Sequence, residues 1–146
     1  MTTSWMNRFG GLLAVVAGVC VLGGCSSTAP AFEVSTYPAG LGQQVLTEAT
    51  VERSGVVMRV TNGSSMALGP GTMWVNQEFS HPVGVLDAGT AVDFDLSAFR
   101  NEFGERFRAG GFWATEKPKL LSLVQIKPDG NGGSLIGLVV VKDEPR

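Results

Sequence analysis

The chain has 146 residues, of which 44% are hydrophobic and 16% charged, and its 11 basic and 13 acidic residues give a formal charge of −2. This is the length of one domain, and the low charged fraction excludes a long disordered polyelectrolyte. The near-neutral charge argues against nucleic acid as a partner, because a nucleic-acid-binding domain normally carries a basic stripe.

The first 24 residues have the organisation of a secretory signal peptide. A polar start with one positive charge, Arg8, precedes an uncharged run of 16 residues from Phe9 to Gly24. A positive region, a short apolar region and small residues before a cleavage point define such a signal. As a helix, this run would span about 24 Å, less than the ~30 Å of a bilayer core. We therefore expect a cleaved leader over residues 1–24 and not a permanent membrane span.

The leader ends in Leu22-Gly23-Gly24-Cys25, which resembles the lipobox of bacterial lipoproteins. In that motif a Leu stands three residues before an obligatory Cys, with small residues between them; Gly23 departs from the commoner Ala or Ser. The resemblance implies cleavage between Gly24 and Cys25, diacylglyceryl attachment to the Cys25 thiol and acylation of the new N-terminus with a chain such as palmitate. The alternative is an ordinary secreted protein in which Cys25 carries no lipid.

The other cysteine, Cys20, lies inside the leader and would leave with it. The mature chain would then hold no free thiol and no disulfide, so its domain must be stable through its own core. Because several acyl chains hold a bilayer far more durably than one chain does, the anchor would keep the domain on a membrane. In a Gram-negative host, Ser26 after the lipidated Cys implies, by the same resemblance, the periplasmic face of the outer membrane.

Residues 25–30 are expected to form the lipidated Cys and a short polar tether, and residues 31–146 a folded domain. Apolar and polar residues alternate over 45–52 and 56–61, which predicts two strands joined as a hairpin at Ser54-Gly55. Further strands are expected over 72–79, 92–96, 120–127 and 134–142, with the turn residues of 128–133 joining the last two.

One short helix is expected over 95–103. Leu96, Phe99 and Phe103 recur there at helical spacing. Ser97 is a suitable N-cap, and Gly104 a suitable end.

Short strands separated by turns indicate an all-β domain, an antiparallel β-sandwich with one short helix. Four segments resemble a pattern found in small, mostly uncharacterised bacterial immunoglobulin-like domains. In that pattern a strand ends in Asn-x-x-aromatic, a Leu-x-x-Gly turn follows, and the next strand runs into a short Phe-containing helix. The resemblance implies an immunoglobulin-like β-sandwich and no activity; its segments are Trp74–Phe79, Leu86–Thr90, Phe94–Phe99 and Gly104–Phe107.

A catalytic triad or a zinc site would have to use His81, the single histidine. Its sequence neighbours indicate a solvated residue in a loop between strands, and we expect no metal site and no cofactor. Asp93 and Asp95 share one side of a strand and could serve as paired acid and base in an envelope hydrolase. Such an enzyme would bury both carboxylates and raise one pKa. Their alternation with apolar residues indicates instead a solvated strand face, so we expect no enzyme.

Phe112 and Trp113 follow two glycines and precede Pro118. Aromatics on a loop favour contact with a partner such as an envelope protein or a glycan, whereas a pair of this kind more often plugs the open end of a sandwich. A binding module predicts an exposed apolar patch near Trp113 or Trp74. The basic residues around this loop are interleaved with glutamates, so they indicate a mixed solvated surface, or alternatively a patch that meets anionic headgroups or peptidoglycan.

Overall fold

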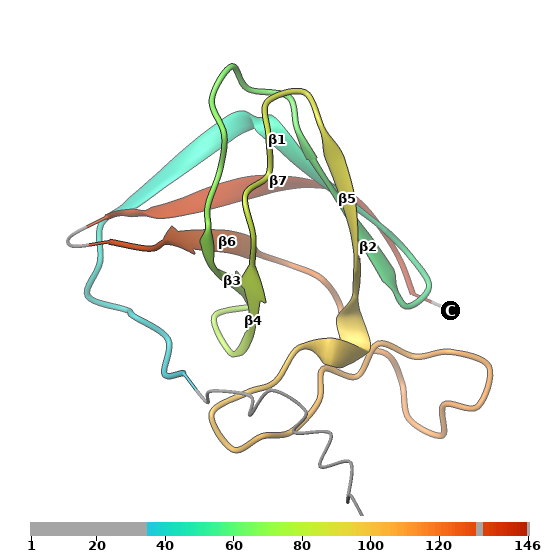
Figure 1. Cartoon of the computed structure of the whole chain (residues 1–146). Helices are drawn as coiled ribbons and strands as arrows, with labels where there is room; N and C mark the ends of the chain where they lie inside the picture. The colour runs from blue at the N-terminus through green and yellow to red at the C-terminus, as the bar shows by residue number, and fades with distance from the viewer. Residues whose placement is uncertain (1–34, 131–132, 146) are drawn as a thin grey trace, which may run out of the picture. The chain divides into compact units, whose positions relative to one another are not determined.

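In the described chain, residues 35–130 and 133–145 of a computed structural model, the regular secondary structure is β-strand apart from one short 3₁₀ turn (Figure 1). The all-β class is therefore confirmed. The strands are β1 (Gln43–Ser54), β2 (Val57–Asn62), β3 (Gly71–Val75), β4 (Phe79–Val83), β5 (Ala91–Asp95), β6 (Val124–Pro128) and β7 (Leu135–Glu144), and a single 3₁₀ turn, η1 (Leu96–Ala98), follows β5.

All of these strands belong to one curled sheet, in the order β4-β3-β6-β7-β1-β2-β5. Neighbouring strands are antiparallel except β1 and β7, which run parallel. The expectation of purely antiparallel pairing is therefore wrong. The parallel pair brings together residues as distant in sequence as Gln43 and Leu135. The residue pattern within each strand does not indicate whether the two strands run parallel or antiparallel.

The two expected hairpins at the centre of the sheet are confirmed. Ser54 pairs with Val57 across a two-residue turn in which Gly55 has a φ of 62°, a conformation that glycine adopts without steric cost. β6 and β7 likewise pair in antiparallel fashion, with Val124 opposite Leu138.

The expected strand over 72–79 is wrong because a turn divides it into β3 and β4. Asn76 and Gln77 have φ values of 53° and 60°, and Val75 pairs with Phe79 across them. Asn tolerates this left-handed conformation better than most residues. His81 consequently lies inside β4, opposite Met73, and not in a loop.

The expected helix over 95–103 shortens to η1, which Asp95 caps in place of Ser97: the Asp95 carboxylate accepts from the Ser97 backbone N–H at 2.8 Å. Beyond η1 the backbone of Arg100 exchanges hydrogen bonds with Ser80 of β4, at 2.7 and 3.1 Å. These bonds use groups that a continued helix would need. Phe103, expected on the apolar helix face, is 80% exposed.

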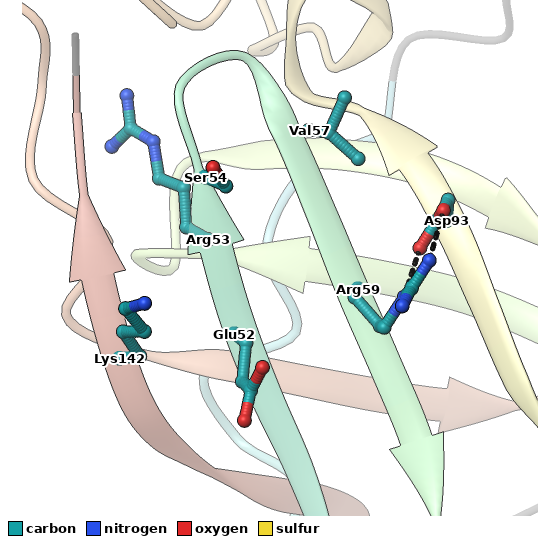
Figure 2. A pocket seen from close by; sticks show the side chains of 7 residues that line it. All are labelled: Glu52, Arg53, Ser54, Val57, Arg59, Asp93 and Lys142. Atoms are coloured by element: carbon teal, nitrogen blue, oxygen red, sulfur yellow. Dashed lines mark hydrogen bonds and ion pairs between the residues drawn. The ribbon is translucent and has the colours of Figure 1, made fainter.

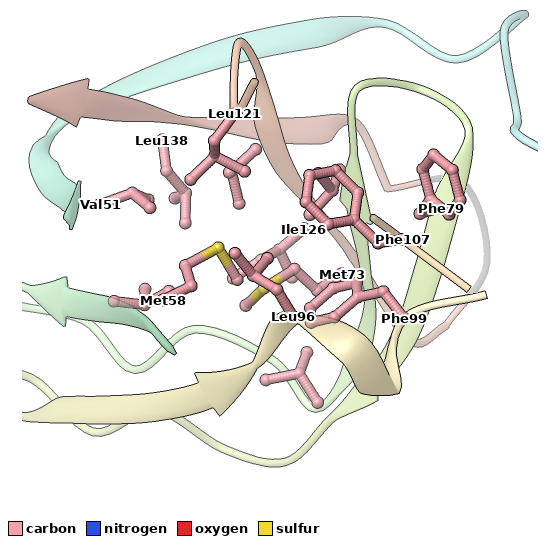
Figure 3. Packing of buried hydrophobic residues seen from close by; sticks show 14 of the residues in the cluster. Val51, Met58, Met73, Phe79, Leu96, Phe99, Phe107, Leu121, Ile126 and Leu138 are labelled. Atoms are coloured by element: carbon pink, nitrogen blue, oxygen red, sulfur yellow. The ribbon is translucent and has the colours of Figure 1, made fainter. Parts of the chain in front are cut away.

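The core lies inside the curl of the sheet, where side chains of β1 and β2 meet those of β3 and β6 (Figure 3). Residues that follow η1 close one end of this core, and the Phe79 and Phe107 rings meet edge to face at 5.2 Å. The labelled core side chains in Figure 3 are Val51, Met58, Met73, Phe79, Leu96, Phe99, Phe107, Leu121, Ile126 and Leu138.

Candidate functional site: a braced loop with two exposed aromatics

The longest irregular segment of the described chain is 99–123, between η1 and β6. Connections longer than about 12–15 residues without secondary structure are uncommon in compact domains, and many of them are functional. The segment is held on the core by four buried apolar side chains, Phe99, Phe107, Ala109 and Leu121. Its conformation is therefore fixed at several points by packing.

Within this segment, residues 109–119 form a loop that we call the aromatic loop. The Lys119 backbone N–H donates to the Arg108 carbonyl at 2.8 Å and closes the base of the loop. Arg108 and Glu116 form an exposed ion pair at 2.8 Å above that base. At the tip, the Ala114 N–H donates to the Gly111 carbonyl at 3.0 Å.

Phe112 and Trp113, at the tip of the aromatic loop, are 89% and 88% exposed. Their rings meet edge to face with centroids 4.7 Å apart. The interpretation that this pair plugs the end of the fold is wrong, because Phe99 and Phe107 fill that position. Trp74, the other aromatic considered for an exposed patch, is buried at 2% exposure, and the Tyr37 ring packs against it at 5.4 Å.

The Arg53 side chain donates hydrogen bonds to both ends of the aromatic loop. Its side chain is fully buried, and its Nη2 donates to the Ala109 carbonyl at 2.7 Å. Its Nη1 donates to the Lys119 carbonyl at 2.8 Å. Ala109 and Lys119 stand at the two ends of the loop, so one planar guanidinium fixes their separation.

Asp143 of β7 completes the cluster around this guanidinium. Its Oδ1 lies 3.1 Å from Arg53 Nη1, and its Oδ2 accepts from the Leu121 N–H at 2.9 Å. The Arg53 guanidinium also lies over the Phe107 ring, 5.7 Å from its centroid. A buried charge that is paired and hydrogen-bonded in this way costs far less than an isolated one.

Arg53 was not among the predicted site residues, although the sequence carries a signal for it. The alternation of Ala49 and Val51 on the inward side of β1 continues to position 53, so a charged residue stands where an apolar one is expected. Asn76 was missed as a site of hydrogen bonding: its Oδ1 accepts from the Ser122 and Leu123 N–H groups at 2.9 and 3.1 Å. These contacts join segments distant in sequence, which no local pattern predicts.

Asp93 belongs to a row of alternating charges across the outer side of four strands. Lys142, Glu52, Arg59 and Asp93 are successive register partners on β7, β1, β2 and β5. They line a hollow of about 240 Å³, in which Arg59 and Asp93 point toward each other and Arg53 points away from them (Figure 2). Two hydrogen bonds of 2.7 Å join the guanidinium to the carboxylate.

The geometry at Asp93 and Asp95 does not support their use as the paired acid and base of a hydrolase. Both residues are exposed. The hydrogen bond from Arg59 holds the pKa of Asp93 below its usual value, and the charge of Arg59 acts in the same direction. A general acid would need the opposite shift. Asp95 uses its carboxylate to cap η1.

His81 is partly exposed on β4, with its ring 5.1 Å from that of Phe99. Over residues 35–130 and 133–145, no three His, Cys, Asp or Glu side chains come together in a way that could hold a metal ion.

Gly24 and Cys25, the expected cleavage and lipidation residues, lie outside the described residues, as does the expected tether. Among the residues that the structure describes, no helix is both long and apolar enough to cross a membrane.

The chain matches no protein-family model, no curated protein and no solved structure.

Proposed function

We propose that the protein is an exported lipoprotein, anchored through Cys25, whose β domain binds at the cell envelope through the aromatic loop. The leader and the Leu22-Gly23-Gly24-Cys25 motif support the anchor. The observation that carries the binding role is the near-complete exposure of Phe112 and Trp113 on a loop whose two ends Arg53 fixes. In a Gram-negative host the site of action is the periplasmic face of the outer membrane.

The energetics favour contact as the role of this pair. Phe and Trp side chains each bury roughly 150–250 Å² when covered, and apolar burial contributes about 25 cal/mol per Å². Since both side chains remain in water in the free protein, that free energy is available to a complex. A loop already held in place by Arg53 also loses less conformational entropy on binding.

We infer further that the curled sheet is immunoglobulin-like. The parallel β1–β7 pair is the point at which two groups of strands meet: β1, β2 and β5 on one side, and β7, β6, β3 and β4 on the other. In constant-type immunoglobulin domains, the first, second, fourth and fifth strands lie in one sheet, and the third, sixth and seventh in the other. The fourth strand departs from that arrangement here, because β4 pairs with β3. This protein lacks the inter-sheet disulfide of antibody domains, since its described residues contain no cysteine. The fold supplies a scaffold and implies no chemistry by itself.

The anchor is tested by metabolic labelling of the full chain in a bacterial host with an alkyne-bearing palmitate analogue. The protein and its C20A variant should incorporate the label, and C25A should not. C20A is a matched control, because Cys20 lies five residues away within the same leader. Labelling of C25A, or failure to label the unaltered protein, would show that Cys25 carries no lipid and leave an ordinary secreted protein.

A further inference from the structure

Three exposed aromatic side chains occupy two neighbouring loops of the domain. Phe103, 80% exposed, lies in a loop closed by the pairing of Arg100 with Arg106. Phe112 and Trp113 occupy the aromatic loop, whose base is the Arg108–Lys119 pair two residues further along the chain. Figure 1 shows both loops at the same end of the domain, beyond η1.

The loop that carries Phe103 is braced as the aromatic loop is. Asn101 is 4% exposed, and its Oδ1 accepts from the backbone N–H groups of Phe103 and Glu105 at 3.1 and 2.8 Å. Its Nδ2 donates to Glu105 Oε2 at 2.7 Å. The buried Asn101 side chain therefore holds the backbone of this loop in the conformation in which Phe103 is exposed.

The described chain begins beside this loop. Ser35, Thr36 and Tyr37 line a hollow of about 180 Å³ together with Asn101 and Phe103. The polypeptide that comes from Cys25 thus enters the domain at the end that carries the exposed aromatics.

The length of the connecting chain restricts which end of the domain can face the membrane. Nine residues lie between Cys25 and Ser35, so even a fully extended backbone could place Ser35 no more than about 33–36 Å from Cys25. A domain of this size has a radius of gyration of about 13 Å, which corresponds to a diameter of about 34 Å for a uniform sphere. The length of the connection therefore favours an orientation in which the end of the domain that carries Ser35 faces the anchoring bilayer.

The charge of the same region suits a phospholipid surface. Residues 96–121 contain five basic and three acidic side chains, a net charge of +2, although the whole chain carries −2. One of the five, Lys119, is paired with Glu78. Burial lowers the pKa of Arg100, and the adjacent charge of Arg106 lowers it further, while the charge of Asp95 raises it. An anionic headgroup would act on Arg100 in the same direction as Asp95.

We propose that Phe103, Phe112 and Trp113 insert into the headgroup region of the bilayer that holds Cys25, and so seat the domain in a fixed orientation. The inference rests on the proposed lipid anchor and names the bilayer as the surface that the aromatic loop binds. Trp concentrates at this depth of a membrane because its apolar ring and its polar indole N–H are both satisfied there. The two Phe rings would add apolar burial at the boundary between headgroups and acyl chains. Basic side chains beside them add attraction to anionic headgroups.

The test uses the lipidated protein, purified from membranes and reconstituted into phosphatidylcholine–phosphatidylglycerol vesicles with brominated acyl chains. Cleavage of the leader removes Trp5, so the emission comes from Trp74, which is buried, and Trp113. Bromine should quench the Trp113 emission, and W113F should lose that quenching. The F103S/F112S variant should show weaker quenching than the unaltered protein.

The experiment distinguishes failure of the lipid anchor at Cys25 from failure of the proposed insertion of the aromatic side chains. A purified protein whose mass contains no acyl chains would remove the anchor itself. An acylated protein whose Trp113 is quenched by aqueous iodide and not by brominated lipid would overturn only the bilayer as the bound surface. That second result would point to a protein or glycan partner for the aromatic loop.

Discussion

Arg53 at the end of β1 and Asp143 near the end of the parallel strand β7 form an ion pair at 3.1 Å, and the arginine side chain is wholly buried. The pair joins the one parallel contact of the described sheet to the loop that carries the exposed aromatics. The same guanidinium thus holds the sheet and the candidate binding site together.

Replacement of Arg53 should therefore be costly. R53M removes the Arg53 donors from Asp143 Oδ1 and from the Ala109 and Lys119 carbonyls, and breaking a buried pair typically costs about 3–5 kcal/mol. Urea denaturation should show a large fall in the free energy of unfolding, and hydrogen exchange should quicken in residues 109–121. R59M, which alters an exposed arginine, should lose much less stability. Equal stability of the two variants would contradict the structural role of Arg53.

Truncation of the aromatic loop tip should leave the fold intact. F112S and W113S alter side chains that are 89% and 88% exposed, and surface substitutions usually change stability by less than about 0.5 kcal/mol. F107A, in contrast, removes a buried ring and should cost about 3–5 kcal/mol. Thermal and urea unfolding of the three variants provide the comparison. A large loss of stability in W113S would mean that Trp113 packs against the domain.

The register of β3 against β6 depends on the absence of a side chain at Gly71. A Cβ there would lie 2.1 Å from the Lys127 carbonyl oxygen, so G71A must push the strands apart. Overpacking of this kind typically costs 1–3 kcal/mol, and about 3 kcal/mol or more is expected against rigid backbone. G84A is the matched control, because its Cβ would meet no atom within 4 Å. A G71A protein as stable as G84A would show that this register is incorrect.

The Arg59–Asp93 pair predicts a pH dependence of stability. The folded protein holds the pKa of Asp93 below its ordinary value of 3.8. The unfolded chain therefore takes up the proton first, and the contribution of the pair is complete above about pH 4 and is lost as pH falls through the folded pKa. NMR titration of the Asp93 carboxyl carbon should give a pKa below 3.8, and R59Q should restore the ordinary value. An unchanged titration in R59Q would rule out the ion pair as the cause.

The parts of the fold that follow from local sequence were predictable. The β1–β2 hairpin follows from alternation on both sides of Ser54-Gly55, and the β6–β7 pair from the Gly-rich turn between them. The parallel β1–β7 contact was not predictable, because it is a long-range pairing that leaves no mark in either strand. The break at Asn76 was missed because Asn is compatible with both strand ends and left-handed turns.

The aromatic residues of the candidate site could be identified from the sequence, but their exposure and the role of Arg53 could not. Phe112 and Trp113 stand out in the sequence between glycines and Pro118, but that pattern favoured burial of the pair, which is wrong, since both side chains are exposed. Phe112 and Trp113 remain exposed because the buried rings of Phe99 and Phe107 fill the end of the core. The contacts of Arg53 were not predictable from sequence, since its partners lie in two segments distant from it: Ala109 and Lys119 in the aromatic loop, and Asp143 in β7.

The lipid anchor, the central claim, is tested most directly by the intact mass of the mature protein and of its N-terminal peptide, purified from the membranes of a bacterial host. We predict a chain that begins at Cys25 and carries a diacylglyceryl group and an added acyl chain on that residue. A chain that begins elsewhere, retains residues 1–24 or has an unmodified Cys25 would contradict the account.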